Sequence, residues 1–344
     1  MLRRFFLQQT GLALMASGLP FPFNSNKVLT KKKMLIPKRL KPGATIALIA
    51  PSSPPSAEKL TKALDNLKEF GFEVIEGKSL RKQNGFLAGN DEERLDDIHW
   101  AFEDDKIDAV WCVRGGYGAG RLLPFIDYKL IKKHPKLFIG YSDVTALHLA
   151  FYQQCNLVTF HGPVAASDFP DDTLHHFQSV VMKGEANHLI QADPENISGT
   201  ELKPFTICHG TAQGALTGGN LTLLAALTGT KFSPEFKNRI VFIEEVGEQP
   251  YRIDRMLTQL LQGTDLSQAA GIALGVFNEC EPKPGSPSFS LEYTLRNQLQ
   301  NLNIPVVYGI PFGHVAHQAT LPYGIQAELD ADKQSLLLLE RAVV

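Results

Sequence analysis

The sequence predicts an α/β protein with a doubly wound amino-terminal domain on a mainly parallel sheet, followed by a smaller mixed α/β domain. The first half alternates strictly between apolar runs and helical segments, which is the pattern of a doubly wound domain. The run ATIALIA, residues 44–50, is continuously apolar and suits a parallel strand covered on both faces. After about residue 170 the alternation loosens, and the polar, turn-rich stretch 193–210 indicates a linker.

The strands and helices of the first half follow from their local patterns. Strands are expected at residues 44–50, 72–77, 108–113, 137–140 and 157–160. The helix after the first strand stops at Gly71, a residue suited to a helix C-terminus. A second helix begins after Asn90, with Glu93 in the position that a capping box requires. A third helix is expected to begin at a corner after Ser142.

The second half is expected to be a mixed α/β arrangement. Strands are expected at residues 239–246, 271–277 and 304–314, a helix at 251–263 and a hairpin at 325–340. No internal repeat and no low-complexity segment is present in the sequence.

Composition and charge exclude some classes of protein. The 344 residues suffice for one large or two medium domains. Because 34 Lys and Arg residues face 36 Asp and Glu residues, the formal charge is −2, which argues against binding of nucleic acid or of a membrane surface. The cysteines stand far apart, and buried free thiols are expected in preference to disulfides or a zinc site: Cys112, Cys155, Cys208 and Cys280.

The amino terminus, residues 1–34, reads as a leader. Arg3 and Arg4 precede Phe6 and an apolar stretch that is too short to span a bilayer, and a small-residue site, ASG, follows. This order resembles a twin-arginine export signal, although Leu2 and Gln8 depart from the usual pattern. The alternatives are an amphipathic leader, an uncleaved anchor, or a cytoplasmic protein that starts at Met34.

Ser142 occupies the corner between an expected buried strand and an expected helix. One interpretation is a helix N-cap, because a serine hydroxyl accepts a hydrogen bond from a free amide of the first turn. The other is a catalytic nucleophile, because such a corner exposes the side chain beside free backbone N–H groups. The corner is not the lipase type, since Val144 stands where that motif requires glycine.

A serine nucleophile needs a histidine to accept its proton and a carboxylate to orient that histidine. The acid could be Glu244 or Glu245, because an apolar strand runs directly into both. The base could be His314, in a glycine- and proline-rich loop after another strand, or His161, which also follows a strand.

Two other types of site are poorly supported. The loop RGGYGAGR, residues 114–121, lacks the spacing of a dinucleotide-binding motif and follows the third strand, so it is either a flexible turn or a loop whose amides line an active site. His314 and His317 lie in a turn-rich segment and make a weak metal pattern. No metal and no cofactor are expected.

Several blocks together resemble one family. IAPSSP, GFLAGNDEERLDDIHWAF, RGGYGAGRLLPFIDY, FIGYSDVTALHLA, GGNLTLLAALTGT, FIEEVGEQPYRIDRML and IPFGHVAHQATLPYG look like the signature blocks of the LD-carboxypeptidases, in family order over roughly residues 40–328. These are serine peptidases that include the muramoyltetrapeptide carboxypeptidases, and the microcin C immunity peptidases are related to them. The resemblance implies a Rossmann-like domain over 35–170, a helix and linker over 171–206, and a swivelling β-rich domain over 207–344.

The same resemblance implies roles for individual residues. Ser142 would be the nucleophile, Glu244 the acid and His314 the base, with Glu245 as a neighbour. The amide of Asp143 and a glycine amide from the loop, Gly115 or Gly116, would form the oxyanion hole. Two further residues, Arg114 and Tyr117, are candidates for binding substrate; a guanidinium such as that of Arg114 binds a terminal carboxylate bidentately.

The implied reaction is hydrolysis of the L,D-peptide bond to the terminal D-alanine of a murein tetrapeptide. The alternatives are an immunity-type peptidase acting on peptidyl-nucleotide antibiotics, and an inactive cell-wall-binding relative. The family implies a homodimer, and the near-neutral charge predicts no nucleic-acid partner. Relatives that recycle murein are typically cytoplasmic, whereas the leader of this chain predicts export to the cell envelope, with no stable membrane insertion after processing.

Overall fold

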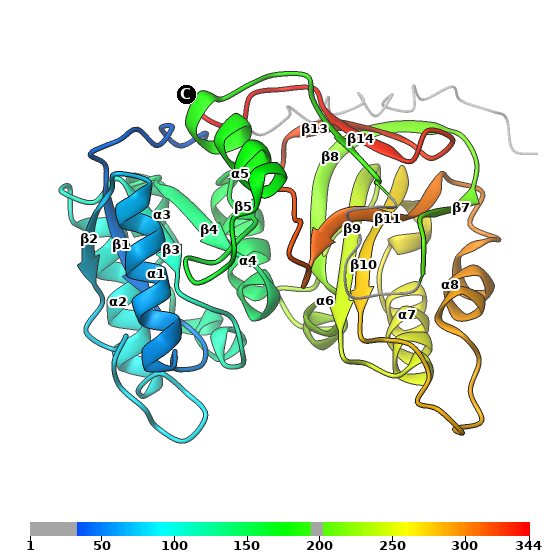
Figure 1. Ribbon diagram of the computed structural model, residues 1–344, viewed down its shortest axis with the longest axis horizontal. Helices are drawn as coiled ribbons and strands as arrows, with labels where there is room; N and C mark the ends of the chain where they lie inside the picture. The colour runs from blue at the N-terminus through cyan, green and yellow to red at the C-terminus, as the bar shows by residue number, and fades with distance from the viewer. Residues whose placement is uncertain (1–32, 194–201) are drawn as a thin grey trace, which may run out of the picture. The chain divides into compact units, whose positions relative to one another are not determined.

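The computed structural model describes residues 33–193 and 202–344, which form two β-sheets with their covering helices (Figure 1). The expected leader lies outside the described residues, apart from Lys33 and Met34. Within the two described ranges, no helix is both long and apolar enough to cross a membrane.

The first sheet has six strands in the described chain, in the order β12-β5-β4-β3-β1-β2. They are β1 (Thr45–Ile49), β2 (Glu73–Glu76), β3 (Ala109–Cys112), β4 (Leu137–Gly140), β5 (Phe160–His161) and β12 (Leu321–Pro322). The first five strands are parallel, which confirms the doubly wound domain expected from the sequence. The last strand, β12, runs antiparallel to β5 and comes from near the end of the chain.

Helices cover both faces of this sheet. They are α1 (Ala57–Glu69), α2 (Asp91–Glu103), α3 (Tyr128–Lys133), α4 (Thr145–Cys155) and α5 (Asp171–Phe177). On one face, Phe102 of α2 and Phe151 of α4 contact Phe138 of β4, with ring centroids 6.2 and 5.0 Å apart. On the other face, Phe177 of α5 stacks on Trp111 of β3 at 4.9 Å. These aromatic contacts bury apolar surface on both sides of the strands, as a parallel sheet requires.

The second sheet, within the same described ranges, has eight strands in the order β6-β14-β13-β8-β9-β10-β11-β7. They are β6 (His188–Gln191), β7 (Phe205–Cys208), β8 (Thr211–Asn220), β9 (Arg239–Val246), β10 (Gly271–Asn278), β11 (Val306–Gly313), β13 (Gln326–Asp330) and β14 (Ser335–Leu338). The four central strands, from β8 to β11, are parallel. Their crossovers are α6 (Leu221–Leu227), α7 (Pro250–Gly263) and α8 (Leu291–Leu299), which lie next to one another in Figure 1.

Several local predictions are confirmed. The capping box of α2 is present, since the Glu93 amide donates to Asn90 Oδ1 and the Asn90 amide donates to Glu93 Oε2, both at 2.9 Å. Gly71 follows the end of α1 with a left-handed φ of 74°. The expected carboxy-terminal hairpin is formed by β13 and β14, which pair antiparallel.

Three predicted stretches differ from the structure. The strand expected at 157–160 is only β5, because Leu157 instead forms an isolated bridge with Leu35. The stretch 193–210, expected as a linker, contains β7, an edge strand that pairs antiparallel with β11. A strand so short carries little periodicity, and its partner lies about a hundred residues away in the sequence. The expected helix and linker region, 171–206, also contains β6, which pairs with β14; the domain boundaries themselves stay predictions.

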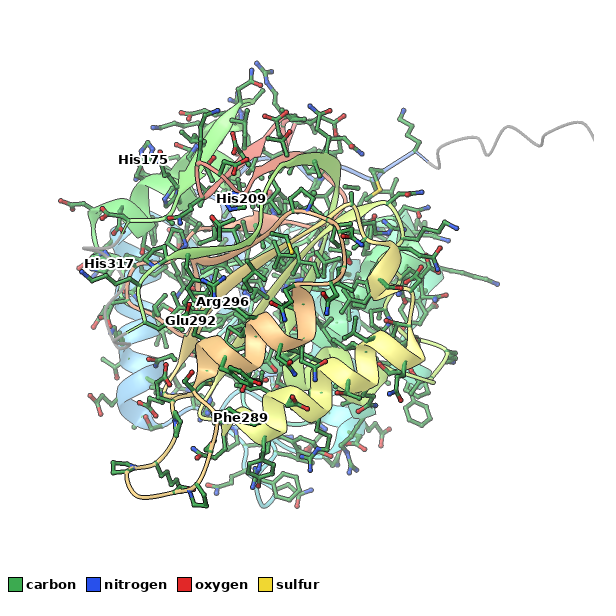
Figure 2. The ribbon with its side chains drawn as sticks, turned by 90° about the vertical axis from the view of Figure 1, so that its right-hand side faces the viewer. His175, His209, Phe289, Glu292, Arg296 and His317 are labelled. Carbon is green, nitrogen blue, oxygen red and sulfur yellow. The ribbon has the colours of Figure 1, made fainter. Side chains whose placement is uncertain are left out.

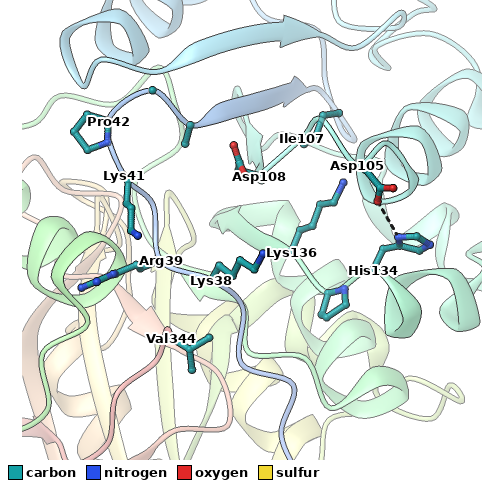
Figure 3. A pocket seen from close by; sticks show the side chains of 13 residues that line it. Lys38, Arg39, Lys41, Pro42, Asp105, Ile107, Asp108, His134, Lys136 and Val344 are labelled. Atoms are coloured by element: carbon teal, nitrogen blue, oxygen red, sulfur yellow. Dashed lines mark ion pairs between the residues drawn. The ribbon is translucent and has the colours of Figure 1, made fainter.

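A cavity of about 650 Å³ lies at the amino-terminal ends of the strands of the first sheet (Figure 3). Its lining includes Ala44, Asp108 and Lys136, which directly precede β1, β3 and β4. None of the predicted site residues lines it. Ligands of open α/β sheets bind at the other ends of the strands, beyond their carboxyl ends, at the point where the strand order reverses. In this sheet the reversal lies between β1 and β3.

Candidate active site

Ser142 lies at the carboxyl end of β4, two residues after its last residue, in a strained backbone conformation. Its φ is 65°, in the left-handed region, and it begins a short 3-10 turn, Ser142–Val144, that leads into α4. The left-handed conformation costs a residue with a side chain about 1–2 kcal/mol. The contacts around the corner must therefore hold Ser142 in place.

Gly115 lies directly against this corner. A Cβ at Gly115 would stand 2.8 Å from Ser142 Cβ and 3.0 Å from Ser142 Oγ, so only glycine fits there. Gly116 has a φ of 119°, and a Cβ on it would stand 2.4 Å from Oγ of Ser53. Ser53, in the turn after β1, accepts a hydrogen bond from the Tyr117 amide at 3.1 Å. The glycine loop after β3 is thus packed between Ser142 and the turn after β1.

The side chain of Asp143 connects the same three segments. Its Oδ2 accepts hydrogen bonds from the Ser52 hydroxyl at 2.5 Å and from the Ala119 amide at 2.8 Å. The carboxyl group is almost fully buried, and burial raises its pKa against the effect of these donors. The prediction concerned only the backbone amide of Asp143; the structure adds that its side chain holds the loops around Ser142.

Glu244 and His314 form a hydrogen-bonded pair at the carboxyl ends of β9 and β11. His314 Nδ1 lies 2.7 Å from Glu244 Oε2, and Glu244 is fully buried. Since a carboxylate only accepts, Nδ1 donates and Nε2 is left without a proton in the neutral ring. Gly313, with a φ of 116°, allows this approach, because a Cβ on it would stand 2.9 Å from Glu244 Cβ.

Each member of the pair changes the pKa of the other. Burial alone would raise the pKa of Glu244, but the charge of His314 and the hydrogen bond from it lower that pKa overall. Burial alone would lower the pKa of His314, but Glu244, with a smaller effect of Glu245, raises it overall. The pair is therefore arranged to hold an imidazolium next to a carboxylate.

Glu245 points to the opposite side and has different partners. It accepts hydrogen bonds from Asn220 Nδ2 at 3.0 Å and from the amide and hydroxyl of Thr222 at 2.8 and 2.7 Å. These contacts join the end of β9 to the start of α6, whose N-cap is Asn220. Burial, followed by the charge of Glu244, raises the pKa of Glu245. Of the two carboxylates that the sequence left open, only Glu244 faces a histidine.

Tyr141 brings the serine corner and the histidine together. Its ring lies against His314, with centroids 4.8 Å apart, and against His161 at 5.9 Å. His161 is fully buried, neither of its ring nitrogens has a hydrogen-bond partner in residues 33–193 and 202–344, and burial lowers its pKa to about 4. Of the two histidines that the sequence left open as the base, His314 is hydrogen bonded to a carboxylate and His161 is not.

The two candidate substrate-binding residues lie in the glycine loop. Arg114 Nη1 donates to the carbonyl of Pro54 at 3.2 Å, which uses one of its five N–H donors. Tyr117 is 56% exposed, and its ring meets the exposed ring of Phe86 with centroids 5.5 Å apart.

His314 and His317, the two residues of the weak metal pattern, have different partners in the structure. His317 Nδ1 lies 2.7 Å from Asp172 Oδ1, whereas His314 faces Glu244. Among the residues that the structure describes, no three His, Cys, Asp or Glu side chains could hold a metal ion together.

The family follows from comparison with known proteins. The family model for the LD-carboxypeptidase N-terminal domain matches residues 46–162, and that for the C-terminal domain matches residues 213–329. The chain belongs to the LD-carboxypeptidase family. This confirms the resemblance drawn from the sequence blocks, and both matched ranges contain residues of the candidate site: Ser142 lies in the first and Glu244 and His314 in the second.

Individual LD-carboxypeptidases and their relatives match most of this chain. A probable murein peptide carboxypeptidase of Bacillus subtilis is 42% identical over 303 residues, 88% of this chain and 93% of that protein. The crystal structure of a muramoyltetrapeptide carboxypeptidase from Oxalobacter formigenes is 33% identical with a TM-score of 0.74, covering 86% of this chain and 97% of the other. A microcin C7 self immunity protein in its wild-type apo state is 25% identical with a TM-score of 0.80, covering 90% of this chain and all of the other.

Sequence reasoning missed the residues that support the site. Ser52, Ser53, Asn220 and Thr222 bind the loops and carboxylates described above, and none was assigned a role from sequence. Only their positions in the sequence could have indicated a role. Two of them are serines directly after the first strand, and one is an asparagine before an apolar helical segment. Their partners lie between 23 and 91 residues away in the chain, so no local pattern identifies them.

The strain at Ser142 can be measured directly. Ser142→Gly should be more stable than Ser142→Ala by about 0.5–1 kcal/mol, because both lack the hydroxyl but only glycine adopts a positive φ without strain. Urea unfolding of the two variants measures this difference. Ser288, whose φ is not positive, provides the control pair, and there alanine should equal or exceed glycine. A Ser142→Gly variant no more stable than Ser142→Ala would show that the corner is unstrained.

Proposed function

We propose that this chain is a serine carboxypeptidase that removes the terminal D-alanine from murein tetrapeptides. The observation that carries the proposal is the buried pair of Glu244 and His314 beside the strained Ser142 corner, with Tyr141 in contact with His314. The substrate is proposed from the relatives that are named murein peptide and muramoyltetrapeptide carboxypeptidases.

In the proposed mechanism, His314 is the general base. Its Nδ1–H donates to Glu244, so its Nε2 can accept the proton of the Ser142 hydroxyl while Oγ attacks the peptide carbonyl. The imidazolium then donates that proton to the departing D-alanine amine, leaving an acyl-enzyme that water hydrolyses. Since the base must be neutral, activity should fall as the pH drops through the pKa of His314, which Glu244 holds above its ordinary value.

The developing oxyanion would be bound by backbone amides at the serine corner. We assign this role to the amide of Asp143 and to that of Gly115 or Gly116, which lie in the segments that meet at Ser142. The Asp143 side chain supports this assignment, because its bonds to Ser52 and to the Ala119 amide hold the glycine loop near the corner.

A carboxypeptidase must also recognise a free terminal carboxylate. Arg114 is our candidate, because its guanidinium stands at the start of the glycine loop with only one N–H bonded to Pro54. Tyr117, exposed at the same loop, is our candidate for contact with the peptide. No step requires a metal or a cofactor.

The activity is tested by incubating the purified protein with murein tetrapeptides that carry diaminopimelate or lysine, and separately with an aminoacyl-adenylate mimic. Mass spectrometry should show loss of one D-alanine from a tetrapeptide, unaffected by a chelator.

Ser142→Ala should lower the rate by on the order of 10³-fold or more. Cleavage of the adenylate mimic alone would favour an immunity-type peptidase, and tetrapeptide binding without cleavage would favour an inactive cell-wall-binding protein.

The two neighbouring carboxylates should differ in their effect on catalysis. Glu244→Gln should lower kcat by on the order of 10³–10⁴-fold, because the amide no longer holds His314 in the required tautomer and charge state. Glu245→Gln should change kcat by less than about tenfold, since its contacts are with α6. Steady-state kinetics on both variants decide the matter, and a larger loss at Glu245 would reverse the assignment.

We also propose export of the protein to the cell envelope. The paired arginines and the short apolar segment support this, and a twin-arginine pathway suits an already folded enzyme without disulfides. Replacing Arg3 and Arg4 by lysine should keep the full-length protein in the cytoplasm, as followed by cell fractionation. A native protein found in the cytoplasm with its first residue near Met34 would contradict export.

The homodimer stays a prediction from the family, which sedimentation of the purified protein would check.

A further inference from the structure

The loop that carries His314 connects the two sheets. It leaves β11 of the second sheet after Gly313 and ends in β12, which pairs with β5 at the edge of the first sheet. His314 is the first residue of this loop, and Ser142 belongs to the first sheet. The position of the loop relative to the first sheet therefore decides how His314 faces Ser142.

Two residues of α5 bind the middle of this loop. Thr173 is fully buried, and its hydroxyl donates to the carbonyl of Ala316 at 3.1 Å while accepting from the amide of Gln318 at 2.9 Å. Its neighbour Asp172 binds His317 at 2.7 Å. One short helix thus satisfies backbone groups on both sides of His317, which is labelled in Figure 2.

The helix α5 is itself anchored in the core of the first sheet. Its last residue, Phe177, is fully buried and stacks on Trp111 of β3 at 4.9 Å. Phe177 also meets Phe70, at the end of α1, with centroids 5.3 Å apart. Because β3 leads directly into the glycine loop that lies against Ser142, α5 is tied to the same strand that supports the serine corner.

We propose that Thr173 is a positioning residue for His314 and that the contact of Asp172 with His317 is a second, weaker one. Through these contacts, α5 fixes the position of the base, His314, relative to the nucleophile, Ser142. This inference rests on the proposed function for its kinetic consequences. The loss of the Thr173 hydroxyl would leave the amide of the buried residue Gln318 unpaired and would release the carbonyl of Ala316, an exposed residue. The loop would shift to give the buried amide a new partner. A shift of about 1 Å in a catalytic group lowers turnover by about a hundredfold.

The kinetic test compares Thr173→Val, which keeps the shape and removes the hydroxyl, with Thr173→Ser, which keeps the hydroxyl. The control is Thr159→Val, since the Thr159 hydroxyl is buried and has no hydrogen-bond partner among the described residues. With murein tetrapeptide as the substrate, Thr173→Val should lower kcat by about tenfold to a hundredfold with KM nearly unchanged. Thr173→Ser and Thr159→Val should stay within about threefold of the parent chain, and Asp172→Asn should lose less than Thr173→Val.

The second readout is the titration of His314 itself, followed by NMR of protein carrying isotope-labelled histidine and assigned with His314→Gln. In the described part of the chain, the charged or titratable groups that act on or contact His314 are Glu244 and Glu245 from β9, His161 from β5 and Tyr141, whose ring lies against it. Glu244 raises the pKa of His314 against the effect of burial. A loosened loop should therefore lower the pKa in Thr173→Val, and move the acid limb of kcat/KM to lower pH, but not in Thr159→Val.

The outcomes separate this inference from the proposed function. If the parent chain does not cleave the tetrapeptide, the proposed function fails, while the NMR titration still tests the positioning role. If Thr173→Val keeps its kcat and the pKa of His314, or if it loses no more than Thr159→Val, the positioning role is overturned. Thr173→Ala replaces Thr173→Val in both measurements if the valine variant does not fold.

Discussion

The hydrogen bond between His314 and the buried carboxylate of Glu244 is the interaction to which the other parts of the site are fitted. A fully buried carboxylate is stable only when a partner compensates its charge, and His314 Nδ1 does so at 2.7 Å. The close approach requires glycine at position 313, where the backbone turns with a φ of 116°. From there the chain passes α5 and reaches β12 on the first sheet. The histidine is thereby held by both sheets.

The serine corner is held by a second set of contacts and meets this pair through Tyr141, whose ring lies against His314. Ser142 keeps a positive φ because Gly115 packs against its side chain and because Asp143 binds the turn after β1 and the glycine loop. These contacts lie at the carboxyl ends of β1, β3 and β4, where the strand order reverses. The strain at Ser142 is therefore balanced by contacts within the domain of the first sheet. Tyr141, the residue before Ser142, connects this corner to His314 by ring contact.

Three buried carboxyl groups in this region serve different purposes, and their partners distinguish them. Asp143 and Glu245 accept hydrogen bonds from backbone amides, hydroxyls and an amide side chain, which holds loops and helix starts in place. Glu244 is bonded to a titratable ring, and its Oε1 has no hydrogen-bond partner in the described part of the chain. A carboxylate that faces a histidine changes proton affinity, whereas one that faces amides and hydroxyls fixes geometry.

The sequence by itself determined the alternation of strands and helices in the first half and the placement of Ser142, Glu244 and Glu245 at strand ends, because these features depend on local periodicity and capping. With the family blocks it also indicated the acid and the base. Only the tertiary structure decided that Glu244 and not Glu245 faces His314, since the register with neighbouring strands sets the direction of each side chain. Only the tertiary structure showed β7, β12 and the ties of α5 to the histidine loop. Thr173 and Gln318 are 145 residues apart, and contacts over such distances leave no pattern in either segment alone.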